Sequence, residues 1–348
     1  MKTKQRFFHN NPCRIIVTLS FKGGTGKTTF IATLAALLAK AGHKVLVVDL
    51  DPQANLSSHM AFDPQFKGNV SKGLYEGHDD WAPEGMKEQV CSMKVDGIKQ
   101  EIDLIPSHHR LEETMATLGS RHVKGEGGED RLKKCLDLLR PHYDYILVDT
   151  PPARQTMSVQ MCLHAADTIL IPVDSFDAID GMAGLLSTIQ GHQKVTSRRP
   201  HEIFMFSPSC PTLASSRPYG ICGVKNSTWY PMMVDRFPHH FIPQVVRRSN
   251  TVQNAARPGM LWSGYSDNFR RMYFDLYTEL TTHRIGNKGI VPLTTWMEDP
   301  ENFDMGRFKD QIRKELATGG AVPVTKRTIF KECAPPKRKT PVADDKAA

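Results

Sequence analysis

The chain alternates between short apolar runs and longer segments in which apolar residues recur at helical spacing. Apolar runs without polar alternation are typical of parallel strands that are covered on both faces. Such runs predict strands at 14–20, 44–51, 102–107, 143–149, 165–173 and 202–207. Helical spacing predicts helices at 30–40, 70–75, 111–118, 130–139, 174–189 and 268–283. The two patterns together predict an α/β fold with a mostly parallel, doubly wound sheet and helices on both faces.

A glycine-rich segment joins the first predicted strand to the first predicted helix. It reads Gly23-Gly24-Thr25-Gly26-Lys27-Thr28-Thr29 and is similar to the phosphate loop of NTPases. Glycines let the backbone wrap around a phosphate with its N–H groups pointing inward, and the following helix adds a positive end. Lys27 is then expected to reach the β- and γ-phosphates of a nucleotide, and the Thr28 hydroxyl to bind Mg²⁺. A glycine-rich turn without a ligand is the alternative.

A second lysine, Lys22, opens this loop, and ordinary phosphate loops do not need it. The run Lys-Gly-Gly-Thr-Gly-Lys-Thr resembles the deviant Walker A loop of the ParA/MinD family of NTPases. The resemblance covers roughly residues 13–283 and implies that residues 22–29 bind ATP with Mg²⁺. It also implies that Lys22 reaches across a nucleotide-sandwich homodimer to the partner's phosphates. A solvated surface lysine is the alternative.

The strand predicted at 44–51 ends in a second segment that is similar to this family. The segment reads Asp49-Leu50-Asp51-Pro52-Gln53-Ala54-Asn55, and the match places Asp51 at the family's catalytic position. A carboxylate there can orient or activate the attacking water and can contact Mg²⁺ through water. An aspartate before proline is also common in turns and helix caps, so that alternative stays open.

The strand predicted at 143–149 resembles a Walker B strand. It delivers Asp149 to the carboxyl edge of the sheet, where ligands bind in open α/β folds. Asp149 is therefore expected to hold Mg²⁺ through water, and the following Thr150-Pro151-Pro152 matches the family's second switch. A buried aspartate with only a structural role is the alternative.

Weaker candidates lie after residue 200. The family often has an asparagine that contacts the base where this chain has Ser207, so base recognition there is in doubt. Pro243, followed by Arg247 and Arg248, resembles a family segment that lies near the base and contacts DNA. The resemblance implies Pro243 as a nucleotide contact and the two arginines as DNA contacts. A pair of solvated arginines is the alternative.

Composition adds broad limits. The chain has 348 residues, of which 40% are hydrophobic and 24% charged, and a formal net charge of +8. A basic chain permits a polyanionic partner such as DNA, although net charge alone is weak evidence. Seven scattered cysteines without a Cys-x-x-Cys pair argue against a zinc site or a disulfide framework. No apolar run approaches the roughly 18 residues of a membrane helix, and the N-terminus lacks a signal-peptide core.

We therefore expect a cytoplasmic protein in three parts. Residues 1–12 are expected to form a flexible basic lead, and residues 13–283 an ATPase domain. Residues 284–348 form a C-terminal extension that is rich in Pro and Lys toward its end, where we expect disorder.

The favoured function is a ParA-type ATPase of DNA partition. ATP would close a Lys22-bridged dimer that binds nucleoid DNA without sequence preference, largely through phosphates. A ParB-like centromere-binding partner would stimulate hydrolysis and release the DNA. A regulatory ATPase that positions a protein complex is an alternative that the sequence leaves open.

Two further alternatives fit the residues less well. A MinD-like membrane ATPase needs an amphipathic C-terminal helix. Residues 334–348 contain prolines and no apolar face, so no stable membrane association is expected. An iron-protein-like reductase needs cysteine ligands close after Asp149, where residues 150–154 hold none and Cys162 lies well into the next helix.

Overall fold

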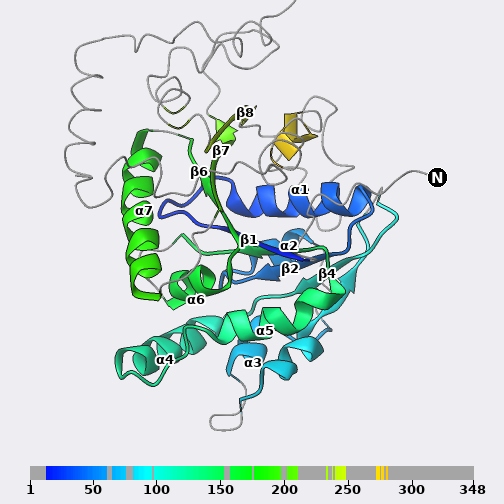
Figure 1. Cartoon of the computed structure of the whole chain (residues 1–348). Helices are drawn as coiled ribbons and strands as arrows, with labels where there is room; N and C mark the ends of the chain where they lie inside the picture. Colours follow the sequence, from blue (N-terminus) through cyan, green and yellow to red (C-terminus); the bar gives the residue numbers. More distant parts are fainter. Residues whose placement is uncertain are drawn as a thin grey trace, which may run out of the picture.

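The computed structural model describes residues 13–60, 65–75, 81–95, 98–152, 157–174, 176–196, 202–210, 233, 237, 240–247, 272–274, 276–277 and 280. These residues form one sheet with helices packed against it (Figure 1). The strands are β1 (Arg14–Thr18), β2 (Val45–Asp49), β3 (Cys91–Met93), β4 (Ile102–Ile105), β5 (Tyr145–Asp149), β6 (Thr168–Pro172), β7 (Glu202–Cys210) and β8 (Phe241–Arg247). The helices are α1 (Lys27–Lys40), α2 (Asn55–His59), α3 (Val70–Tyr75), α4 (Leu111–Val123), α5 (Arg131–Leu139), α6 (Met157–Ala165) and α7 (Phe176–Thr196), with 3-10 turns at Pro83–Gln89 and Arg140–His142.

The strand order is β3-β4-β2-β5-β1-β6-β7-β8. Strand β3 pairs with β4 in the antiparallel sense, and every other neighbouring pair is parallel. The chain leaves β1 toward β2 on one side and later places β6 on the other side. The order therefore changes direction around β1, and such a switch point is where open α/β sheets bind ligands. The prediction of a mostly parallel, doubly wound sheet is confirmed.

Both faces of the sheet are buried, and this explains the apolar runs without alternation. On β5, Tyr145 and Leu147 join the core cluster formed with α1, whereas Ile146 and Val148 join the cluster formed with α5 and α6. Figure 1 shows α1 on one side of the sheet and α4, α5 and α6 on the other. Because successive side chains of a strand point to opposite faces, each strand must be apolar at both positions.

The segment 58–100 contains more structure than the one short helix that was predicted at 70–75. Helix α3 lies where it was predicted, but the 3-10 turn at Pro83–Gln89 and strand β3 were missed. Strand β3 has only three residues, with Ser92 exposed and Met93 buried, so its alternation is too short to stand out in a sequence. It is specified by pairing with β4 rather than by its own pattern.

Two helices extend beyond the ends predicted for them, at 118 and 189. Helix α4 continues through Gly119 to Val123 and stops at Gly125, whose φ of 74° is left-handed. The Glu126 N–H then donates to the Arg121 carbonyl at 2.9 Å, as in a Schellman cap. Helix α7 likewise includes Gly191 and ends at Thr196. A glycine therefore ends a helix here only where the backbone turns left-handed.

The helix predicted at 268–283 contributes to the core where the structure describes it. Tyr273, Leu276 and Leu280 are buried in the cluster that contains α1, as its apolar face predicts. The ring centroids of Phe30 and Tyr273 lie 6.4 Å apart. Within the described ranges, none of the helices combines the length and the apolar character that a membrane crossing requires.

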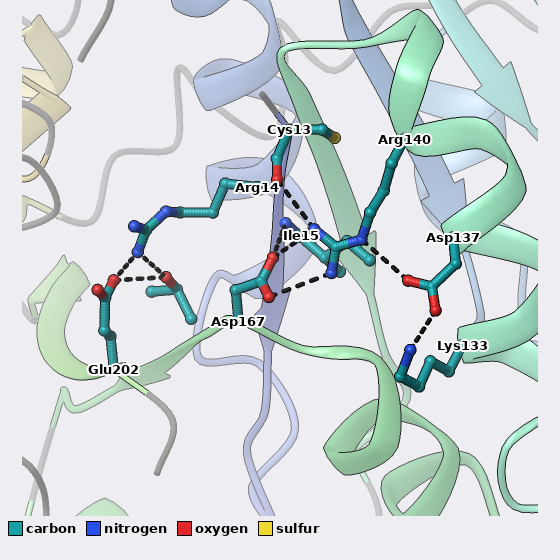
Figure 2. A network of polar contacts seen from close by, with 9 residues as sticks. Cys13, Arg14, Ile15, Lys133, Asp137, Arg140, Asp167 and Glu202 are labelled. Atoms are coloured by element: carbon teal, nitrogen blue, oxygen red, sulfur yellow. Dashed lines mark hydrogen bonds and ion pairs between the residues drawn. The ribbon is translucent and has the colours of Figure 1, made fainter. Parts of the chain in front are cut away.

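A network of charged side chains joins the amino ends of three strands (Figure 2). The Arg140 guanidinium donates to both oxygens of Asp167, at 2.8 and 3.1 Å, and to the Cys13 carbonyl at 2.9 Å. Asp167 also accepts the Ile15 backbone N–H at 2.8 Å. Arg14 pairs with Glu202 at the start of β7. This network fixes the edge of the sheet opposite the phosphate loop.

Replacing Asp167 with alanine should lower the free energy of unfolding by about 2–3 kcal/mol, because the half-buried Arg140 loses its bidentate carboxylate partner and the Ile15 N–H loses its side-chain acceptor. Urea unfolding followed by circular dichroism measures this. Lys94→Ala is the control, because Lys94 is 89% exposed and its pair with Glu101 spans 3.9 Å; such a pair contributes little. Equal unfolding midpoints for the two variants would contradict this role.

Candidate functional site

The loop between β1 and α1 has the backbone geometry of an anion-binding turn. Gly24 and Gly26 have φ values of 73° and 84°, which residues with a Cβ rarely adopt. Gly26 caps α1, so this helix begins at Lys27 rather than at the expected Phe30. The first N–H groups of α1 therefore face the end of the loop, as anion binding at a helix N-terminus requires.

The loop departs from the general phosphate-loop pattern at Phe21. The first glycine of that pattern, five residues before the second, corresponds to Phe21 in this chain. A Cβ built on Gly184 of α7 would lie 3.3 Å from the Phe21 ring, and one built on Gly181 would lie 3.7 Å from the Phe21 Cβ. Phe21 therefore packs closely on the glycine face of α7, and this contact sets the start of the loop against that helix.

Lys27 is buried next to two carboxylates. Its exposed fraction is 6%. Burial lowers the pKa of the Lys27 ammonium, while the charges of Asp149 and Asp51 oppose that shift. Strands β2 and β5 are neighbours, with Asp49 paired in register to Asp149. The structure therefore brings together Lys27, Asp51 and Asp149, which lie far apart in the sequence.

Asp149 is fully buried at the end of β5. Burial raises the pKa of its carboxyl to about 7, and the charge of Asp49 adds to this, while the Thr28 hydroxyl and the Lys27 ammonium lower it. The Thr18 hydroxyl approaches Asp149 Oδ1 at 3.4 Å. Asp149 Oδ2 has no hydrogen-bond partner among the residues that the structure describes. A buried carboxylate with an open oxygen fits a ligand that carries positive charge or donates hydrogen bonds.

Asp51 is buried and lies in a tight turn. Its Oδ1 accepts the Gln53 N–H at 3.0 Å, and its carbonyl accepts the Ala54 N–H at 2.9 Å. Ala54 has a φ of 52°, the only positive φ among described residues other than glycine. Asp51 thus has the turn role that the sequence left open. The position beside Lys27 is a separate feature that a turn alone does not require.

Asp49 is a buried carboxylate that accepts three hydrogen bonds. In the sequence it stood out only as the start of the segment that contains Asp51. It accepts the Asp51 N–H at 3.1 Å and both the N–H and the hydroxyl of Ser57, at 2.8 and 2.7 Å. Burial raises the pKa of the Asp49 carboxyl to about 6, and these hydrogen bonds oppose that shift. The spacing Asp-x-Asp followed by Ser57 is the only sequence signal for this group.

Lys22 lies near a carboxylate that the sequence did not single out. Its Nζ is 3.8 Å from Asp174 Oδ1, just after β6, and the Lys22 side chain is 37% exposed. The remaining candidates are not placed: β8 contains Pro243 and Arg247, but their side chains, and all of Arg248, lie outside the described residues.

Cys162, weighed above as a cluster ligand, lies on α6 in the core cluster. Burial raises the pKa of its thiol, and the charge of Asp149 adds to the shift. A buried, protonated thiol of this kind is not the thiolate that a metal cluster needs, so the structure gives no support to the reductase alternative.

A protein-family model described as an AAA domain matches residues 13–200 of this chain. The chain is 33% identical to the sporulation initiation inhibitor protein Soj of Bacillus subtilis over 182 residues, which span 52% of this chain and 66% of Soj. It is 29% identical to a ParA family protein of Chlamydia muridarum over 71% of this chain and 88% of that protein. It is 28% identical to the chromosome partitioning protein ParA of Caulobacter vibrioides over 52% of this chain and 63% of that protein.

Solved structures show the same fold. A structure of a single-residue variant of Cyanothece McdA in complex with ATP superposes with a TM-score of 0.61 at 23% identity, covering 81% of this chain and 100% of that one. The loop geometry, the strand order and the relatives agree: the chain belongs to the ParA/MinD family of deviant Walker A ATPases and resembles its ParA and Soj members.

Proposed function

We propose that the chain is an ATPase of DNA partition, in which ATP closes a homodimer that holds DNA and hydrolysis releases the DNA. The observation that carries this proposal is the buried group of Lys27, Asp51 and Asp149 beside the left-handed turns of the loop. A buried ammonium that lies near carboxylates and at the start of a helix suits a phosphate chain, because it supplies positive charge where water cannot screen it.

The residues present fit a nucleotide with Mg²⁺. Two buried oxygens, Thr25 Oγ1 and Asp149 Oδ2, have no hydrogen-bond partner within the described part of the chain. The Thr28 hydroxyl would bind Mg²⁺ directly, whereas Asp149 and Asp51 would hold it through water. Mg²⁺ favours such sites, in which one or two carboxylates act together with water and substrate phosphates. Bound Mg²⁺ would supply positive charge to the phosphate oxygens.

The chemistry that follows is the transfer of the γ-phosphoryl group of ATP to water, giving ADP and phosphate. The loop N–H groups and Lys27 bind and orient the phosphates, and Asp51 orients the attacking water. Lys22 would complete the site of the partner protomer in the dimer. The DNA, the ParB-like partner and the nucleoid location are inferred from the ParA relatives.

Lys22→Ala should prevent ATP-dependent dimerisation while leaving the fold intact, because the Lys22 side chain is partly exposed and its 3.8 Å approach to Asp174 is too long for a hydrogen bond. Sedimentation velocity with ATP and with ADP measures this directly. Lys44→Ala, at an exposed lysine near the opposite edge of the sheet, serves as the control and should dimerise normally. A normal ATP-dependent dimer of Lys22→Ala would remove this role.

Arg247→Ala should weaken DNA binding to a similar extent for unrelated sequences and reduce the slope of log affinity against log salt by about one. Adjacent residues of an extended segment point to opposite sides, so Arg248→Ala is the matched control and should have a smaller effect. If neither variant changes the slope, the contacts lie elsewhere, and the basic run Lys337-Arg338-Lys339 is the next candidate.

A further inference from the structure

Three buried residues, Asp49, Ser57 and Ser107, form a chain of hydrogen bonds next to the Asp51 turn, which we call the relay. The Ser57 hydroxyl donates to Asp49 Oδ2 at 2.7 Å and accepts the Ser107 N–H at 3.0 Å. The exposed fractions of Asp49, Ser57 and Ser107 are 0, 2 and 6%. Because the Ser107 N–H can only donate, the Ser57 hydroxyl proton must point toward the carboxylate. This relay therefore has one defined arrangement.

The relay fixes the Asp51 turn from both ends. At its start, Asp49 Oδ1 accepts the Asp51 N–H at 3.1 Å. At its end, Asp49 Oδ2 accepts the Ser57 N–H at 2.8 Å in the first turns of α2. Between these points the chain passes through Ala54, whose positive φ is strained for a residue with a Cβ. Such a conformation persists only where its surroundings hold it.

We propose that Ser57 is a positioning residue for ATP hydrolysis, whose hydroxyl acts through Asp49 to hold Asp51 beside the phosphate loop. The inference rests on the proposed ATPase function and on the role of Asp51 in it. Ser57 itself does not touch the reacting atoms. Its bond to Ser107 also ties the turn to the end of β4, the strand next to β2. Catalysis depends on such placement, and a misplacement of about 1 Å can cost on the order of 100-fold in rate.

A substitution at Ser57 is a cleaner test than one at Asp49, because the charge of Asp49 also raises the pKa of Asp149. Ser57→Ala should lower kcat for ATP hydrolysis by roughly 10- to 100-fold, with the Kd for ATP nearly unchanged. Ser57→Thr keeps a hydroxyl and should restore most of kcat. Ser57→Cys replaces the alanine variant if that variant does not fold. Its thiol has a similar shape but is only a weak hydrogen-bond donor, so kcat should fall in this variant as well.

The matched control is Ser71→Ala, because the Ser71 hydroxyl is also buried and bonds the Thr114 hydroxyl at 2.6 Å, between α3 and α4. Both alanine variants should lose stability in thermal unfolding, but only Ser57→Ala should lose kcat. The inference would be overturned if both variants lost kcat in proportion to their loss of stability, or if Ser57→Ala kept the wild-type kcat. Either result would leave the proposed ATPase function standing. A wild-type protein that does not hydrolyse ATP would overturn the proposed function, and this inference with it.

Discussion

Asp51→Ala is expected to bind ATP and to dimerise, but to hydrolyse ATP at least about 100-fold more slowly than the wild type, because the attacking water loses the carboxylate that orients it. The phosphate contacts that we propose for Lys27 and for the loop N–H groups do not involve Asp51, so this variant should keep them. Steady-state release of phosphate gives the turnover, and titration with a fluorescent nucleotide gives the affinity.

Asparagine at the same position separates the turn role that the structure shows for Asp51 from the catalytic role that we propose for it. Asp51→Asn keeps an oxygen that can accept the Gln53 N–H, and therefore keeps the turn, but it removes the charge. It should be as slow as Asp51→Ala. Asp144→Ala, at the opposite edge of the sheet, should keep wild-type turnover. Wild-type turnover of Asp51→Asn would show that Asp51 is only a turn residue.

Lys27→Met should abolish measurable ATP binding, which means a loss of affinity of about 100-fold or more, because the phosphates lose their buried cationic partner. Methionine retains the apolar stem of the side chain, so the packing of the first turn of α1 should survive. Calorimetric titration with ATP and Mg²⁺ measures the affinity. Lys44→Met should bind as the wild type does, and equal affinities for all three proteins would refute the phosphate-loop assignment.

Much of the fold was predictable because a strand that is buried on both faces appears in the sequence as an uninterrupted apolar run. The apolar run of β5 predicts where this strand lies, and Asp149 was expected at its carboxyl end. Lys27 was identified from the glycine-rich turn that it follows, and it lies at the start of α1. Strand β3 was not predictable, since its three residues depend on pairing with β4. The ends of α4 and α7 were predicted too early, at 118 and 189, whereas both helices continue through a glycine, Gly119 and Gly191.

The sequence named the charged residues that the structure brings together, Lys27, Asp51 and Asp149, but not the residues that hold them in place. Asp51 was named from the family resemblance of the segment 49–55. Ser57 and Ser107 are ordinary serines in the sequence, and they become partners only because β2 and β4 lie side by side. Asp174 is a similar case, because its distance to Lys22 depends on β6 lying next to β1. Local motifs identify groups that act on a ligand, and tertiary contacts identify those that position them.

The measurement that tests the central claim most directly is DNA binding in the presence of ATP and of ADP. Fluorescence anisotropy of labelled duplexes of unrelated sequence, with Mg²⁺ and increasing salt, gives the affinity in each nucleotide state. The account predicts tight, sequence-independent binding with ATP, weak binding with ADP, and no ATP-dependent binding for Lys22→Ala. Absence of DNA binding in every nucleotide state, together with ATP-dependent sedimentation on lipid vesicles, would contradict it and favour a MinD-like membrane ATPase.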